Sequence, residues 1–170
     1  MAMGRRSQGQ QQEMFLMASE IRSSANPFYR ALDGLLEKHG FDAFAEDTCR
    51  AFYAENRGRP GIPPGVYFRM MMVGYLEGIG SERGIAWRCA DSISLREFLG
   101  YGLPENPPEH STLSKTRKRL SVEAHAAVFG PVLALLQESG LLTGKTLGVD
   151  ATTPGHRSGG DHGTVHVQGL

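Results

Sequence analysis

The most constraining feature of the sequence is an apolar run from Val66 to Leu76. Apolar side chains would cover most of the circumference of a helix built from this run, not one face. The run falls short of the roughly 18 apolar residues of a membrane span and contains Arg69, and no other stretch reaches that length. Its consecutive methionines suit irregular packing better than an exposed binding surface. The run therefore predicts the central helix of a helical bundle.

Start and stop signals predict further helices on both sides of this run. Asn26 and Pro27 have the order of a cap and a first helical residue, and Gly40 would end that helix. A second helix is expected from about Asp42 to Glu55, with a buried face that includes Phe44. Pro131 predicts a kink or split in the last helix. The other helices are expected to begin at serine caps: Ser81, Ser94 (with Glu97 as a capping box), Ser111 and Ser121.

Composition narrows the class of protein. The chain has 170 residues, of which 40% are hydrophobic, enough for one domain with a core. Its net charge is +0 at pH 7, so any affinity for DNA has to come from local clusters of cations. Cys49 and Cys89 lie in apolar helical patterns, which favours buried free thiols in a cytosolic protein over a disulfide or zinc site. Residues 1–24 predict a disordered or docking segment and no signal peptide.

A basic helix is predicted directly after the proline-rich break at residues 104–108. Leu113 and Leu120 lie two turns apart and fall on one face of the helix together with Arg117. Arg117 is a candidate DNA contact, and alternatively its stem covers that apolar face. No acid occurs between His110 and Leu120, so the other side presents cations and hydroxyls. Such side chains neutralise phosphates and read base edges, although a solvated basic face is commoner for a short run. The candidate DNA-contacting residues are Ser111, Thr112, Ser114, Lys115, Arg117, Lys118 and Arg119.

The segments before the basic helix resemble a helix-turn-helix unit. Short helices are expected at residues 81–90 and 94–99, followed by a turn and the basic helix. The linker at residues 100–110 is longer than the usual turn of such a unit. Arg83 and Arg88 lie outside the apolar pattern of the first helix, where we expect them to contact phosphates. This context favours DNA binding over a merely solvated face.

The period of the sequence changes near the C-terminus. Residues 146–152 alternate with period two and predict a strand, with Asp150 near its end. This carboxylate is a candidate metal ligand, although a lone Asp is more often a turn former, and two-metal chemistry needs several acids. Residues 154–170 are rich in Gly and His and predict a disordered tail after a frameshift or premature stop. A metal site at His156, Asp161, His162 and His166 is the less favoured alternative.

Across residues 25–153 the chain resembles the N-terminal part of bacterial insertion-sequence transposases of the DDE class. The resemblance rests on ANPFY at 25–29, PPGVYFRM at 63–70, YLEGIGSER at 75–83, REFLG at 96–100, EHSTLSKTR at 109–117 and LGVDAT at 147–152. It implies a helical domain at 25–142 that recognises the ends of the element. It also implies an RNase H-like domain that cuts and joins DNA with two Mg²⁺ ions. Residues 143–153 would be its first strand, and Asp150 matches its first catalytic, metal-binding acid.

The sequence therefore predicts a mostly α protein, a helical bundle with a helix-turn-helix-like unit followed by one strand of an incomplete RNase H-like domain. The expected partner is double-stranded DNA at insertion-sequence ends, and a homo-oligomer or a mixed oligomer with an intact transposase stays open. No cofactor and no membrane partner are expected for this fragment. The expected location is the cytoplasm of a bacterium, in association with the nucleoid. With one catalytic acid, the chain alone is expected to be inactive. The alternatives are an interaction fragment that regulates an intact transposase, and an inactive pseudogene product.

Overall fold

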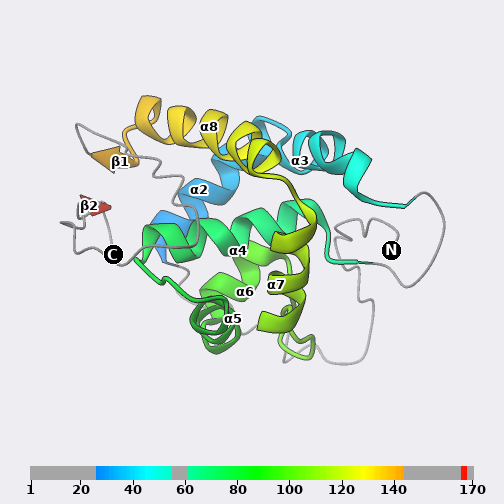
Figure 1. Ribbon diagram of the computed structural model, residues 1–170. Coiled ribbons are helices and arrows are strands. Elements are labelled where there is room, and N and C mark those ends of the chain that lie inside the picture. Colours follow the sequence, from blue (N-terminus) through cyan, green and yellow to red (C-terminus); the bar gives the residue numbers. More distant parts are fainter. Residues whose placement is uncertain (1–25, 55–60, 144–165, 168–170) are drawn as a thin grey trace, which may run out of the picture.

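The computed structural model describes residues 26–54, 61–143 and 166–167, and this part of the chain is mostly α-helical (Figure 1). The mostly-α prediction is confirmed. The predicted strand at 146–152 and the predicted disordered stretch 1–24 lie outside the described residues. The helices are α2 (Pro27–Lys38), α3 (Phe41–Cys49), α4 (Pro64–Leu76), α5 (Glu82–Asp91), α6 (Ile93–Leu99), α7 (His110–Arg119) and α8 (Val122–Glu138), with a 3-10 turn η1 (Arg50–Phe52). Two short strands, β1 (Leu142–Thr143) and β2 (His166–Val167), pair antiparallel.

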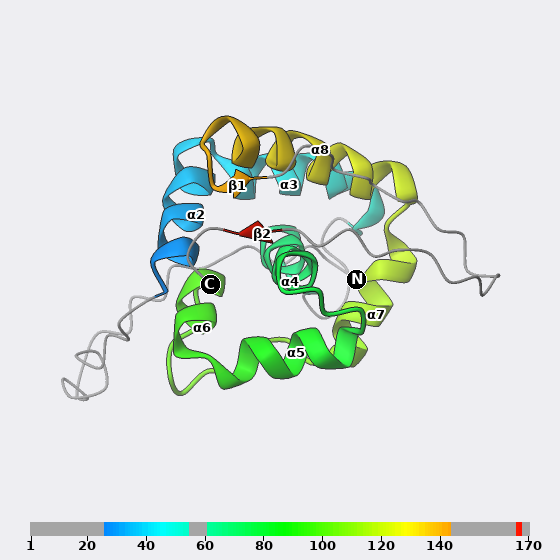
Figure 2. The ribbon, with the colours of Figure 1, turned by 90° about the vertical axis from the view of Figure 1, so that its left-hand side faces the viewer.

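Helix α4 lies at the centre of the bundle, as its uniformly apolar sequence predicts. In Figure 2 it is seen nearly end-on, with α3 and α8 above it and α5 below. Helices α3, α5 and α6 pack directly against it. Gly74 lets α4 and α5 approach closely, since a Cβ there would lie 2.5 Å from the Cδ1 atom of Ile85. Burial on every side explains why this helix lacks the one-sided pattern of a surface helix.

Arg69 is the one charged residue of α4, and it is fully buried. Its Nη1 lies 2.5 Å from Asp42 of α3, and its Nη2 lies 3.2 Å from Asp33 of α2. The guanidinium also lies over the rings of Phe41 and Phe98, 5.2 and 5.5 Å from their centroids. A buried cation is tolerated only when it is paired and hydrogen-bonded. Arg69 therefore ties three helices together at the centre of the core.

Three of the predicted helix caps are confirmed. Asn26 caps α2, accepting a 3.0 Å hydrogen bond from the backbone N–H of Phe28. Ser81 caps α5 and Ser121 caps α8, each accepting a 3.2 Å bond from the backbone N–H three residues later. Gly40, Gly100 and Gly140 have positive φ angles of 63°, 78° and 72° at helix ends, where glycine carries no Cβ penalty.

Two predicted caps are wrong. Helix α6 is capped by Ser92, not Ser94, because the chain turns at Ser92, whose extended backbone also ends α5. The Ser94 hydroxyl instead accepts a 3.2 Å hydrogen bond from the backbone N–H of Asn26. Helix α7 begins at His110, so Ser111 lies inside its first turn. The backbone carbonyl of Glu109, directly after the proline-rich segment, accepts hydrogen bonds from the N–H groups of Thr112 and Leu113.

Two expectations about helix length and packing are also wrong. Helix α3 ends at Cys49 and buries Phe41, Ala45 and Cys49, whereas Phe44 is 38% exposed. The four-residue spacing of these buried positions leaves Phe44 on the outer side. Of the kink or split predicted at Pro131, the split is absent, because α8 continues through this residue. Pro131 lies on the exposed side of the helix, where the carbonyl that loses its partner can reach water. Cys49 and Cys89 are free and buried, as predicted.

Candidate nucleic-acid interface

The buried face of α7 differs from the predicted one. Leu113, Thr116 and Leu120 are 0%, 2% and 5% exposed, so Thr116 takes the position expected for Arg117. The Thr116 hydroxyl donates to the backbone carbonyl of Thr112 at 2.9 Å, which satisfies this polar group inside the core. The spacing of three and then four residues is that of one helical stripe. The sequence pattern did not predict Thr116 as part of this stripe, because threonine is a polar residue.

Arg117 lies toward α5 and pairs with Glu82, with 3.0 Å between Nη1 and Oε1. Both side chains are partly exposed, at 57% and 28%. The backbone N–H of Glu82 itself, at the start of α5, and then the Arg117 guanidinium lower the pKa of the Glu82 carboxyl. Arg117 therefore holds α7 against α5. Glu82 was missed in the sequence because this contact joins two separate helices.

Arg119 does not point freely outward, as the helical pattern predicts, but is half-buried against Tyr53. Its guanidinium carbon lies 5.2 Å from the centroid of the Tyr53 ring. Burial raises the pKa of Tyr53 to about 12, and the charge of Arg119 opposes that rise. The C-terminal end of α7 is thereby attached to the segment that follows η1. No local signal links these two residues, so the sequence does not reveal the contact.

The remaining basic residues of α7 lie on one exposed face. Ser111, Lys115 and Lys118 are exposed and spaced by four and three residues, so they follow one another along the helix. Thr112 and Ser114 are half-buried beside them. Helix α7 contains no carboxylate. The predicted set of DNA-contacting residues is thus divided into cations that support the helix and cations that project from it.

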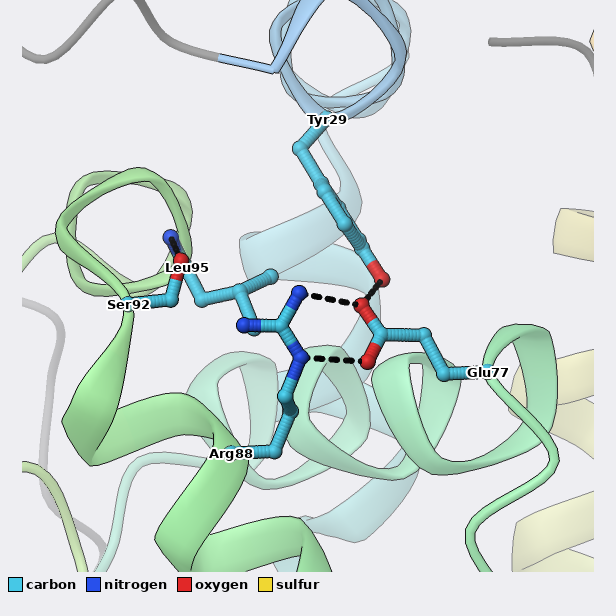
Figure 3. Close-up of polar contacts among 5 residues, drawn as sticks. All are labelled: Tyr29, Glu77, Arg88, Ser92 and Leu95. Atoms are coloured by element: carbon cyan, nitrogen blue, oxygen red, sulfur yellow. Dashed lines mark hydrogen bonds and ion pairs between the residues drawn. The ribbon is translucent and has the colours of Figure 1, made fainter. Parts of the chain in front are cut away.

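The two arginines predicted on α5 also differ from one another. Arg83 is exposed, whereas Arg88 forms a forked ion pair with Glu77 at 2.6 Å and 3.1 Å (Figure 3). Tyr29 of α2 donates to the same carboxylate at 2.8 Å. The hydrogen bonds to Glu77 raise the pKa of Arg88, while burial and then Glu77 raise the pKa of Tyr29. Arg88 was expected outside as a phosphate contact, but it joins α5 to α4 and α2.

Helices α5, α6 and α7 follow one another with α7 packed on α5. One residue, Ser92, separates α5 from α6, and a longer irregular segment leads to α7. The helix-turn-helix interpretation of this arrangement stays a prediction. Asp150 lies outside the described residues, and within these residues no group of three or more His, Cys, Asp or Glu side chains is placed to hold a metal ion.

No single helix of the described part is long and apolar enough to cross a membrane. Helices α7 and α8 meet that criterion only when they are taken together, and they are bent by 106° at their junction.

Fold and site define a helical domain that presents one basic helix at its surface. Residues 17–119 match the family described as Transposase domain (DUF772). This match covers more than half of the chain, so the chain belongs to this transposase-domain family. The match ends at the last residue of α7 and includes α2 to α7. No curated protein and no solved structure matches the chain.

Proposed function

We propose that this transposase domain binds double-stranded DNA at insertion-sequence ends through the exposed face of α7. The observation that carries the proposal is the acid-free row of Ser111, Lys115 and Lys118 on a helix whose opposite side is anchored in the core. Lysines neutralise phosphates, and serine and threonine hydroxyls contact phosphates or base edges. Arg83, exposed on the neighbouring α5, would add a phosphate contact.

The contacts within the domain support two roles for the cations: some hold the helices together, and others are exposed to bind DNA. Arg117, Arg119 and Arg88 interact with Glu82, Tyr53 and Glu77, so they keep α5 and α7 in place. Lys115 and Lys118 are exposed on α7, so they can reach a phosphate without breaking a contact of the fold. A protein surface that is already in place loses little conformational freedom on binding. We therefore assign the first DNA contacts to these two lysines.

Titration of the full chain with a duplex of the terminal sequence and with a scrambled duplex, at several salt concentrations, tests the proposal. Lys115→Gln and Lys118→Gln should each weaken binding to both duplexes and lower the salt slope by about one. Lys38→Gln, which removes an exposed lysine from the end of α2, is the matched control and should bind like the parent. Unchanged binding by the α7 variants would refute the assignment of this face.

A preference of about 10³ or more for the terminal sequence would mark the domain as a specific reader of element ends. A steep salt slope without preference would leave only general affinity for DNA. Asp150 remains the proposed first metal-binding acid of the catalytic part, on the strength of the resemblance. Mg²⁺-dependent nicking by this chain, lost in Asp150→Ala, would show that it carries the reaction itself.

A second candidate function is association with another copy of the domain, either of this chain or of an intact transposase. The observation that favours it is the outer side of α8, where Val122 is 68% exposed and Ala126, Gly130 and Ala134 are also exposed. These small residues, four apart, would let another helix approach closely. Sedimentation of the parent and of the Ala126→Glu variant measures the oligomeric state. A parent dimer that the variant does not form supports this function, and a monomeric parent excludes self-association through α8.

A further inference from the structure

The segment between α6 and α7 is arranged around one side chain, Arg96 of α6. Its Nη1 donates to the backbone carbonyl of Ala90, in the last turn of α5, at 3.1 Å. Its Nη2 donates to the carbonyl of Leu103 at 3.0 Å and of Gly102 at 3.4 Å, and also contacts the carbonyl of Glu105. One guanidinium therefore joins the end of α5 to the segment that leads into α7.

Within residues 102–108 the backbone makes one hydrogen bond to itself, from the N–H of Glu105 to the carbonyl of Gly102 at 3.2 Å, and the other bonds of these residues come from side chains. The segment has no helix or strand between Gly100 and Glu109, and its prolines provide no backbone N–H groups. Residues 102–106 are exposed, so water can reach their carbonyls, and the bonds from Arg96 hold the segment in one conformation rather than satisfy buried groups. Besides Arg96, the carboxylate of Glu105 accepts from the backbone N–H of Gly102 at 2.7 Å. Arg suits this position because its planar fork presents several donors in fixed directions.

We propose that Arg96 is the positioning residue of the DNA-contacting helix, fixing where α7 begins relative to α5. The inference rests on the proposed function of α7. Arg96 acts at the C-terminal end of α5, and the pair of Arg117 with Glu82 acts at its N-terminal end. Two links at opposite ends of one helix fix both the position and the direction of its neighbour. Since one helical residue is a rotation of about 100°, even a small loss of register would turn the α7 lysines away from DNA.

The consequence for binding is a change in population rather than the loss of a contact. Without Arg96, α7 would spend part of its time misplaced, and the apparent affinity would fall by the fraction of correctly placed molecules. The bound complex would still contain the same phosphate contacts. Its salt slope should therefore stay that of the parent, whereas removing a phosphate contact lowers the slope by about one.

The test uses the full chain with Arg96→Gln and Arg96→Lys, and with Arg30→Gln at an exposed position of α2 as the matched control. Amide hydrogen exchange is followed at Gly102, Glu105 and Thr112, whose N–H groups are bonded within the segment or at the start of α7. Both Arg96 variants should exchange faster there, by about tenfold, with exchange in α4 unchanged. Lysine should not rescue exchange, because a single ammonium cannot span the same carbonyls.

In the DNA titration, both Arg96 variants should bind the terminal duplex about five- to tenfold more weakly with an unchanged salt slope. Parent-like exchange at the three amides would overturn the proposal, and so would a slope lowered by one in the glutamine variant but not in the lysine variant. Should the glutamine variant fail to fold, the lysine variant decides alone. If the parent does not bind DNA, the proposed function fails, yet the exchange experiment still determines whether Arg96 positions α7.

Discussion

Replacing Arg69 by methionine tests whether a buried cation holds the centre of this bundle together. Methionine has a similar length and suits irregular core packing, so the change removes charge and hydrogen bonds more than volume. Arg69 is 0% exposed and bonds to Asp42 at 2.5 Å and to Asp33 at 3.2 Å. Without the guanidinium, two carboxylates from α2 and α3 would face an apolar side chain on α4.

The size of the effect follows from the exposure of the partners. Removing one member of a buried ion pair costs about 3–5 kcal/mol, because the other charge remains without compensation. The Asp33 and Asp42 side chains are 25% and 30% exposed, so both can regain some hydration. Lost interactions with the rings of Phe41 and Phe98 add to the cost, and the apolar methionine offsets part of it. We expect a loss of about 3 kcal/mol and a fall in Tm of roughly 10 °C.

Urea unfolding followed by far-ultraviolet circular dichroism measures the free energy of unfolding of each variant. Arg30→Met removes an exposed arginine from α2 and should change stability by less than about 0.5 kcal/mol. Arg69→Lys keeps the charge without the fork that reaches both acids, so its stability should lie between the parent and the methionine variant. The triple variant Arg69→Met, Asp33→Asn, Asp42→Asn should regain part of the loss. A methionine variant as stable as the parent would refute the reasoning.

The remaining predictions concern exposure, charge and pH. Glu82→Gln weakens the ion pair through which Arg117 holds α7 against α5, so DNA binding should weaken a few-fold with an unchanged salt slope; an anisotropy titration that shows tighter binding and a slope raised by about one would mean that Arg117 contacts DNA instead. Trp87 is the sole tryptophan and is 70% exposed, so its emission maximum should shift little on unfolding, and a strongly blue-shifted native spectrum would contradict this exposure. Burial raises the pKa of Cys49 to about 11 and of Cys89 to about 12. The folded chain thus keeps protons that the unfolded chain loses above about pH 8.5, and its stability should fall from there toward pH 12, as urea midpoints would show.

The parts of the fold that the sequence predicts depend on neighbouring residues in the chain. The apolar circumference of α4 and the caps at Asn26 and Ser121 are local patterns, and the structure confirms all three. At α7 no serine is the cap, since the helix begins after Glu109 without a side-chain cap. The error at Ser94 is of a different kind, because Ser92 and Ser94 both satisfy the same local rule near the start of α6. Only the packing of the finished bundle determines which of them becomes the cap, and here it left Ser94 to bind the start of α2.

The direction of the basic side chains depended on residues far away in the sequence. Arg117, Arg119 and Arg88 each meet a partner from another segment, namely Glu82, Tyr53 and Glu77. A helical pattern describes the angle at which a side chain leaves its helix but not what lies opposite it. Arg96 shows the same limit, since its acceptors are backbone carbonyls, which every sequence contains.

Under the proposed function, the number of cations that contact DNA follows from this division and can be measured. The sequence alone offers six candidates on α5 and α7, whereas the structure leaves three of them exposed and without a hydrogen bond or ion pair among the described residues: Arg83, Lys115 and Lys118. With a slope of about −0.9 for each neutralised phosphate, six contacts predict about −5 for the salt dependence of log K, and three predict about −3. A slope near −3 would mean that three of the six cations contact DNA, while the other three stay in their contacts within the fold. A slope near −5 would mean that the arginines leave Glu82, Tyr53 and Glu77 when DNA binds, and that α5 and α7 rearrange in the complex.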